Sequence, residues 1–305
     1  MSSDTNGRPS AIHTGLPTRH PLVFFFLIAF VAAWLVWAPV VLSATGAGLL
    51  NFTIPPPVAA GIIAAGTFAP TLAAFVMSAV TEGRAGIHSL LRRYVLWRVS
   101  FRWYLFVLLA IPASEVLGAI VLPGVVASHQ SLTLSLLLSY PVALALTFIL
   151  GGPLGEEPGW RGFALPRLQL LRGPLAGSIT LGILWASWHL PLFWSGVWTP
   201  LTIPNIVMFI AMITALTVIM TWVFNNAKGS LLITMLMHAS FNTFADKVVV
   251  PLFPAPILNE YPLLPALIGF GIVALLVVAF TRGHLSYEHY RQEEALDSAA
   301  ALRSR

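Results

Sequence analysis

Long runs of apolar residues are the feature that most limits what this chain can fold into. A helix needs ~20 apolar residues to cross the hydrocarbon core of a bilayer, and about eight such runs follow one another along the sequence. They lie at residues 22–43, 58–80, 102–122, 132–153, 174–195, 204–224, 230–247 and 262–281. Apolar residues make up 57% of the 305 positions and charged residues only 9%. The sequence therefore predicts an all-α, polytopic membrane protein with about eight transmembrane helices.

Basic residues gather in alternate connections between these runs, as they do on the cytoplasmic side of membrane proteins. They are Arg8, Arg19, Arg84, Arg92, Arg93, Arg98, Arg102, Arg167, Arg172, Lys228 and Arg282. The intervening connections at residues 44–57, 123–131 and 196–203 contain no Lys or Arg. We therefore expect a multi-pass protein of the cell membrane with both termini in the cytoplasm. The net charge is +5, but because it is spread over loop edges rather than one stripe, it predicts no nucleic-acid partner.

The composition outside and inside the runs suggests three regions. Residues 1–20, rich in Ser, Thr, Gly and Pro, predict a short disordered cytoplasmic lead. Residues 21–282 form the membrane domain, and residues 283–305 form a charged, Ala-rich cytoplasmic tail. The chain has no cysteine, so any chemistry must use carboxylate, imidazole, amide or hydroxyl groups. Nothing in the pattern specifies an oligomeric state.

The fourth apolar run is far longer than one straight span requires, because the first cytoplasmic arginine after it is Arg167. It contains the sequence LGEEPGWRGFALPRLQ, which begins at Leu154. Its natural break points are Gly151, Gly152, Pro153, Gly155, Pro158 and Gly159. Irregular backbone at membrane depth is tolerated only where it faces protein or a water-filled cavity. We therefore expect Glu156 and Glu157 to border a cavity.

Ionisable residues inside membrane spans are rare and by default indicate function. Those in the predicted spans are Glu115, Glu156, Glu157, Arg161, His189, His238 and Asp246. His238 and Asn242, in the sequence HASFN, are four residues apart and share one face of their helix. No motif surrounds Glu115, which we interpret as a helix-packing residue, and Asp246 is predicted to pair with Lys247 or to cap the outer helix end.

The two adjacent carboxylates are predicted to have different roles. Glu157 and Arg161 have the i to i+4 spacing of a helical ion pair, which leaves Glu156 unpaired. An unpaired carboxylate in a water-filled cavity is suited to act as a base on water held near His189 and His238. Asn242 and one histidine would then stabilise an oxyanion. Alternatively, Glu156, His189 and His238 ligate Zn²⁺ and leave one position open for water.

These residues match three motifs of a known family. Two Glu, three residues and Arg appear as Glu156, Glu157 and Arg161. An aromatic residue, three residues and His appear as Trp185 and His189, with Trp where Phe is usual. His, three residues and Asn appear as His238 and Asn242. Over about residues 130–250 the chain resembles the CPBP family (CAAX prenyl protease and bacteriocin-processing proteins, also called Abi), which includes type II CAAX prenyl endopeptidases.

The resemblance implies an eight-helix intramembrane endopeptidase. It would hydrolyse a peptide bond of a membrane-associated or lipidated protein or peptide with water activated by glutamate. It implies that Glu156, His189, His238 and Asn242 are catalytic and that Glu157 and Arg161 support them. Both glutamic and metalloprotease labels are attached to the family, so no cofactor is certain and Zn²⁺ remains an open alternative.

Two other classes of function fit an intramembrane carboxylate. A proton-coupled transporter places carboxylates beside a broken helix, but such folds commonly show inverted repeats, and the motif residues here occur once. A non-catalytic immunity or scaffold protein would keep the fold and bind a partner without cleaving it. The presence of all four predicted catalytic residues favours the protease over both.

Overall fold

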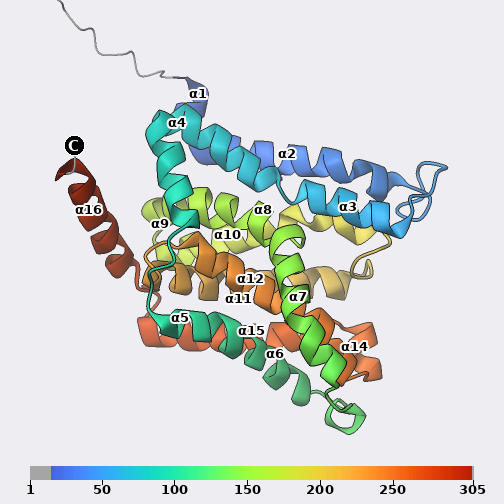
Figure 1. Ribbon diagram of the computed structural model, residues 1–305. Helices are drawn as coiled ribbons and strands as arrows, with labels where there is room; N and C mark the ends of the chain where they lie inside the picture. The colour runs from blue at the N-terminus through green and yellow to red at the C-terminus, as the bar shows by residue number, and fades with distance from the viewer. Residues whose placement is uncertain (1–14, 304–305) are drawn as a thin grey trace, which may run out of the picture.

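The computed structural model describes residues 15–303, with side chains described through residue 295 (Figure 1). Within that range every regular element is a helix and there is no strand. Most of the predicted disordered lead, residues 1–14, lies outside the described range. The rest of it contains the short helix α1 (Leu16–Arg19). The predicted cytoplasmic tail contains α16 (Tyr287–Arg303).

Seven helical segments are long and apolar enough to cross a membrane, and the predicted all-α, polytopic membrane fold is confirmed. They are α2 (Pro21–Leu42); α3 (Pro56–Gly66) with α4 (Ala69–Tyr94); α5 (Phe101–Leu105) with the π-helical η1 (Phe106–Ala110) and α6 (Ile111–Ile120); α7 (Leu134–Leu150) with α8 (Pro153–Glu157), the π-helical η3 (Pro158–Ala164) and α9 (Leu165–Arg172); α10 (Pro174–Trp188) with the 3₁₀-helical η4 (Leu190–Trp194); α11 (Ile203–Asn226); and α15 (Leu264–Thr281). The protein is therefore a multi-pass membrane protein.

The remaining predicted span, residues 230–247, is helix α12 (Leu231–Phe244). Alone it has 14 residues, fewer than a straight span needs. It continues through the π-helical η5 (Ala245–Val249) into α13 (Val250–Leu252), which supplies the missing length. Helix α12 packs against α4, α6, α7, α8 and α11, so it lies at the centre of the bundle. Two short elements complete the fold, η2 (Val126–Ser128) and α14 (Pro256–Glu260).

The predicted break in the fourth region is confirmed. Helix α7 ends at Leu150, and α8 begins at Pro153 after Gly151 and Gly152. Gly152 has a φ of 108°, a conformation that residues with a side chain rarely adopt. Pro158 then lacks the N–H that would continue the α-helical ladder, and the chain passes into η3. The break turns the short helix α8, which carries Glu156 and Glu157, into the interior of the bundle.

Two of the predicted break points have another role. At Gly155 the nearest neighbours of an added Cβ are backbone atoms of Thr67, and at Gly159 they are atoms of Pro70. No side chain fits at either position, so the backbone of α8 and η3 packs directly on the junction of α3 and α4. Close approach through glycine is a common way to pack helices in membranes. These glycines hold the carboxylates deep in the bundle rather than interrupting the helix.

Small residues also bring α6 and α15 together. A Cβ at Gly118 would meet the backbone of Pro265, and one at Gly269 would meet the backbone of Ser114. Helix α15 packs in turn on α11, and α11 packs on α10. Helices α6, α15, α11 and α10 thus pack one against the next, and α12 packs against α6 and α11 (Figure 1).

Helix α4 bends at Gly83, where φ is 63° and ψ is −144°. The bend redirects the second half of the helix, as Figure 1 shows. Its last turn carries Arg92 and Arg93. Arg93 reaches α16, where its guanidinium contacts Tyr290 and Glu294. The amphipathic end of α4 is thereby tied to the C-terminal helix.

Candidate active site

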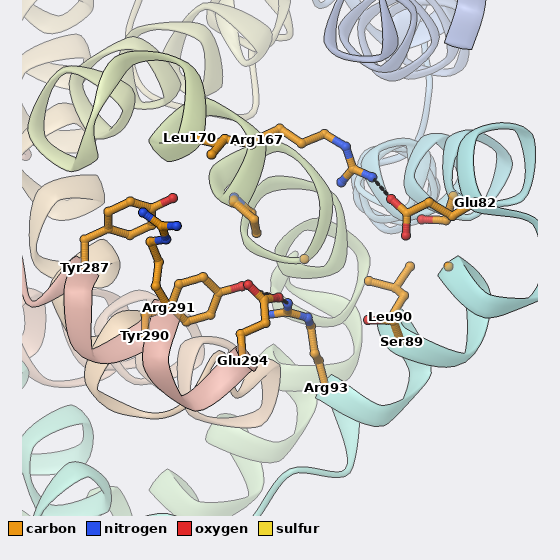
Figure 2. A pocket seen from close by; sticks show the side chains of 14 residues that line it. Glu82, Ser89, Leu90, Arg93, Arg167, Leu170, Tyr287, Tyr290, Arg291 and Glu294 are labelled. Atoms are coloured by element: carbon orange, nitrogen blue, oxygen red, sulfur yellow. Dashed lines mark hydrogen bonds and ion pairs between the residues drawn. The ribbon is translucent and has the colours of Figure 1, made fainter. Parts of the chain in front are cut away.

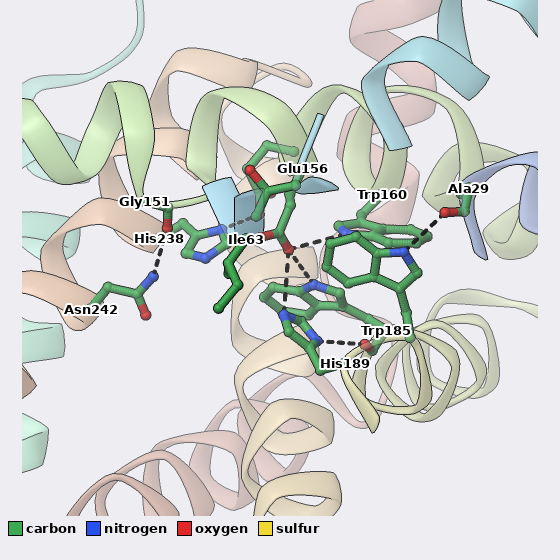
Figure 3. Close-up of polar contacts among 12 residues, drawn as sticks. Ala29, Ile63, Gly151, Glu156, Trp160, Trp185, His189, His238 and Asn242 are labelled. Atoms are coloured by element: carbon green, nitrogen blue, oxygen red, sulfur yellow. Dashed lines mark hydrogen bonds and ion pairs between the residues drawn. The ribbon is translucent and has the colours of Figure 1, made fainter. Parts of the chain in front are cut away.

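Glu156 lies at the centre of the candidate site, in the last turn of α8. It is 3% exposed and therefore shielded from lipid and bulk water. Its Oε2 atom accepts a hydrogen bond of 2.6 Å from Nε1 of Trp185 and a longer one of 3.4 Å from Nε1 of Trp160 (Figure 3). Its Oε1 atom points toward Gly152. The carboxylate is thus held at one oxygen and free to act at the other.

Glu157 and Arg161 form the ion pair that their spacing predicts. Nη1 of Arg161 donates to Oε1 of Glu157 at 2.8 Å, and both side chains are fully buried. The guanidinium also lies 4.1 Å above the ring of Trp185, as a cation–π contact. A buried charge requires a partner of this kind. The pair therefore accounts for one of the two adjacent carboxylates.

The second partner of Glu157 is His238, in the middle of α12. Nδ1 of His238 lies 2.8 Å from the same oxygen, Oε1 of Glu157. The imidazole ring stacks on Phe241 and is almost fully buried. Because an ionised carboxylate only accepts hydrogen bonds, Nδ1 must carry the hydrogen and Nε2 is left available.

His189 ends α10 and completes the site from a third helix. Its Nδ1 atom is 2.9 Å from the carbonyl oxygen of Trp185, which again assigns the hydrogen to Nδ1. Its Nε2 atom lies 3.9 Å from Oε2 of Glu156. The ring stacks on Trp198 and meets Phe209 edge to face. Aromatic walls thus fix the ring with Nε2 directed at the carboxylate.

Gly152 lies against these groups. A Cβ at this position would press on Oε1 of Glu156 and lie 3.7 Å from Nε2 of His238. The absence of a side chain allows the carboxylate to lie this close to the backbone. The break between α7 and α8 therefore shapes the site as well as placing the carboxylates.

Asn242 lies at the edge of the site rather than at its centre. Nδ2 of Asn242 donates to the carbonyl oxygen of Gly151 at 3.3 Å, next to the break (Figure 3). The structure thus brings together Glu156, His189 and His238, and places Asn242 one helical turn beyond His238 facing the end of α7. To bind an oxyanion, as predicted, Asn242 would have to break its hydrogen bond to Gly151 and donate to the substrate instead.

The indole groups were missed by reasoning from the sequence. Trp185 matches the aromatic position of its motif, but nothing in that motif predicts a hydrogen bond from Trp185 or Trp160 to Glu156. Trp160 stands four residues after Glu156, the same spacing that identified the pair of Glu157 and Arg161. That spacing was the available signal, because an indole N–H one turn away can donate to a carboxylate.

Neither Glu115 nor Asp246 joins the site. Glu115 is 1% exposed in α6, and neither carboxyl oxygen forms a hydrogen bond within the described part of the chain. Asp246 lies in η5 and is exposed. The interpretation of both as structural residues stays a prediction.

The positions of the donor atoms test the alternative that Glu156, His189 and His238 ligate Zn²⁺. Both histidines have Nδ1 bound to oxygen and Nε2 available, the state that metal-ligating histidines adopt. Their arrangement fits less well. Among the described residues, no three or more His, Asp or Glu side chains are placed so that they could hold one metal ion. Oε2 of Glu156 is also already engaged by two indole groups. As placed, the three side chains do not form a metal site.

The sequence model of the type II CAAX prenyl endopeptidase Rce1-like family matches residues 138–244. Over this segment the match confirms the resemblance to the CPBP family that the motifs predict. The matched segment contains all four predicted catalytic residues, Glu156, His189, His238 and Asn242.

A curated relative supports the same assignment. The chain is similar to CAAX prenyl protease 2 of Methanococcus maripaludis, with 30% identity over 98 residues. The aligned part covers 28% of this chain and 34% of the relative. The likeness therefore concerns about a third of each protein rather than the whole membrane domain.

Proposed function

We propose that this chain is an intramembrane endopeptidase in which Glu156 activates water to hydrolyse a peptide bond. The observation that carries the proposal is the convergence of one carboxylate and two imidazoles, from three separate helices, around Gly152, where we propose a gap that holds water. The match of this segment to a family of CAAX prenyl endopeptidases supports the same reaction class. Glu156, His189, His238 and Asn242 are the proposed catalytic residues.

The first step is attack by water. A water molecule in the gap loses a proton to Oε1 of Glu156 while its oxygen bonds to the carbonyl carbon of the substrate. The carbonyl oxygen becomes an oxyanion. Trp185 and Trp160 hold the other carboxylate oxygen, which keeps Oε1 directed at the gap. Without a cysteine in the chain, and without any seryl motif in the sequence, attack by water is preferred to a covalent intermediate.

Stabilisation of the oxyanion falls to His238. The Glu157 carboxylate accepts the Nδ1 hydrogen and orients the ring, and the Nε2–H of the protonated ring donates to the oxyanion. Arg161 balances the charge of Glu157, so with His238 protonated the three groups carry one net positive charge, which the oxyanion neutralises. Glu157 and Arg161 are therefore positioning residues.

Collapse of the intermediate breaks the carbon–nitrogen bond. The leaving amine takes the proton that Glu156 removed from water, so the products are a carboxylic acid and an amine. The amine takes this proton directly from Oε1 of Glu156. His189 lies beside the other oxygen, Oε2, and orients the carboxylate. Asn242 can orient the substrate backbone by giving up its bond to Gly151.

The proposed substrate is a membrane-associated or lipidated protein or peptide. The site lies inside a multi-pass membrane domain, so a scissile bond must be brought to the bilayer to reach it. The name of the relative, CAAX prenyl protease 2, favours a lipidated polypeptide as the first class of substrate to test. We further propose that the protein resides in the cell membrane with both termini in the cytoplasm.

The test compares peptide termini by mass spectrometry in host membranes that contain equal amounts of wild type, Glu156→Gln or Glu115→Gln. The second variant makes the same chemical change outside the candidate site. New termini should appear with wild type and Glu115→Gln and be absent with Glu156→Gln. Termini that persist in Glu156→Gln would refute the mechanism. Absence of new termini with all three proteins would favour a scaffold or carrier.

A further inference from the structure

A second cavity lies between α4, α9 and α16 (Figure 2). Its volume is about 390 Å³, within the range of small-molecule sites. None of the proposed catalytic residues lines it. Its wall carries three arginines, Arg93, Arg167 and Arg291, together with the phenol groups of Tyr287 and Tyr290. Such groups are hydrogen-bond donors suited to an anion.

Two of the arginines are paired with the carboxylates of the same cavity. Arg93 donates to Glu294 at 2.6 Å and to the hydroxyl of Tyr290 at 2.8 Å. Arg167 pairs with Glu82 on the opposite wall (Figure 2). Both acidic side chains of the lining are thus neutralised. Burial raises the pKa of Tyr290, so its hydroxyl stays protonated, and it donates its hydrogen to Glu294 at 2.9 Å.

Arg291 is the third arginine of the cavity wall and takes part in neither of these two pairs. It forms no ion pair within the described part of the chain, and its exposed guanidinium stands beside Tyr287 in Figure 2. Three arginines against two glutamates leave one positive charge in excess in the cavity. A ligand that neutralises this excess carries a single negative charge.

The rim of the cavity is apolar on one side. Leu170 lines it and is 72% exposed, and its neighbour Leu171 is 71% exposed. A free inorganic anion would not contact the exposed leucines. An amphiphile with a charged head group and apolar chains would contact both the arginines and the leucines. The arginines belong to the predicted cytoplasmic side. The leaflet on that side carries anionic lipids.

We propose that the cavity between α4, α9 and α16 binds the phosphate head group of a singly charged anionic phospholipid, whose acyl chains run past Leu170 into the bilayer. Arg291 is the principal contact, and Arg167 and Tyr287 complete the polar wall. The site is independent of the proposed peptidase reaction.

Thermal unfolding of the purified full chain in neutral detergent tests the proposal, because a ligand that binds only the folded state raises the unfolding midpoint. The additives are short-chain phosphatidylglycerol, short-chain phosphatidylcholine and inorganic phosphate at equal concentrations. Phosphatidylglycerol should raise the midpoint most. Arg291→Gln should weaken its apparent affinity about fivefold, as loss of one basic contact predicts. Arg84→Gln removes an exposed arginine of α4 that does not line the cavity, and should leave the affinity unchanged.

Each other outcome overturns the proposal. An equal shift with phosphatidylcholine would mean that the lipid charge is not recognised. An equal shift with inorganic phosphate would mean that the site takes a free anion instead of a lipid. An unchanged response in Arg291→Gln would place lipid binding elsewhere. Native mass spectrometry of the lipid retained by wild type and Arg291→Gln supplies a second measurement that does not depend on thermal stability.

Discussion

Nδ1 of His238 lies 2.8 Å from Oε1 of Glu157, the same oxygen that accepts a hydrogen bond from Arg161. One carboxylate oxygen thus links a histidine of α12 to an arginine of η3. The arrangement gives Glu157 a role that adjacency to Glu156 alone does not suggest. It orients an imidazole and is itself neutralised by a buried guanidinium.

Removing the charge of Arg161 should lower the free energy of unfolding. Arg161→Met leaves Glu157 as an uncompensated buried charge, and breaking such a pair typically costs about 3–5 kcal/mol. We expect a loss of unfolding free energy of this order in an SDS titration of the purified protein. The double variant Glu157→Leu with Arg161→Met removes both charges and should recover most of the stability while cleavage stays low. Equal stability of Arg161→Met and wild type would show that the pair is not needed.

Trp185→Phe should slow cleavage without disrupting the fold. It keeps an aromatic ring in the position where Phe is usual in the family but removes the shorter hydrogen bond to Glu156. A hydrogen bond to a charged group contributes about 1.5–3 kcal/mol, so kcat should fall about 10- to 100-fold. Trp160→Phe removes the longer bond, and its effect should be smaller. The reverse order of effects would be inconsistent with the geometry.

Gly152→Ala should abolish cleavage. The new methyl group would occupy the space beside Oε1 of Glu156 and close the gap proposed to hold water. Gly124→Ala is the matched control, because Gly124 also has positive φ but no atom lies within 4 Å of its added Cβ. The control should lose only about 1 kcal/mol of stability and keep its activity. Activity in Gly152→Ala comparable to that of the control would mean that the gap does not hold the reacting water.

Cleavage should survive chelation. The described His, Asp and Glu side chains form no group that could hold a metal ion, and the mechanism proposed above uses none. Dialysis of purified enzyme against a strong chelator, followed by metal analysis and an activity assay, checks this expectation. Loss of activity that returns only on addition of Zn²⁺ would favour the alternative in which Glu156, His189 and His238 become ligands after rearrangement.

Hydropathy predicted most of the fold because few backbone structures are stable in the hydrocarbon core of a bilayer. Each predicted run had to be a helix of about 20 residues, since unsatisfied backbone groups are too costly in hydrocarbon. The break before Glu156 was also readable, because Gly152 and Pro153 are adjacent. The role of Gly155 and Gly159 was not, because close approach to Thr67 and Pro70 depends on a partner helix that sequence spacing does not reveal.

Local spacing predicted some contacts of the site and missed others. The i to i+4 spacing correctly paired Glu157 with Arg161. The meeting of Glu156, His189 and His238 involves three helices, so it was predicted from their being ionisable residues of the membrane spans and from the resemblance to a family rather than from spacing. The bond between His238 and Glu157 is likewise a long-range contact. Asn242 was expected beside the reacting groups, yet the turn that separates it from His238 places its amide against Gly151.

The most direct test of a Glu156-dependent peptidase is reconstitution. Purified wild type and Glu156→Gln are placed in liposomes with a substrate found by comparing membrane peptide termini, in water enriched in ¹⁸O. Wild type should produce a new C-terminus that carries ¹⁸O from water, and Glu156→Gln, folded to the same extent, should produce none. Cleavage by Glu156→Gln at a rate near that of wild type would contradict the assignment of Glu156 as the base.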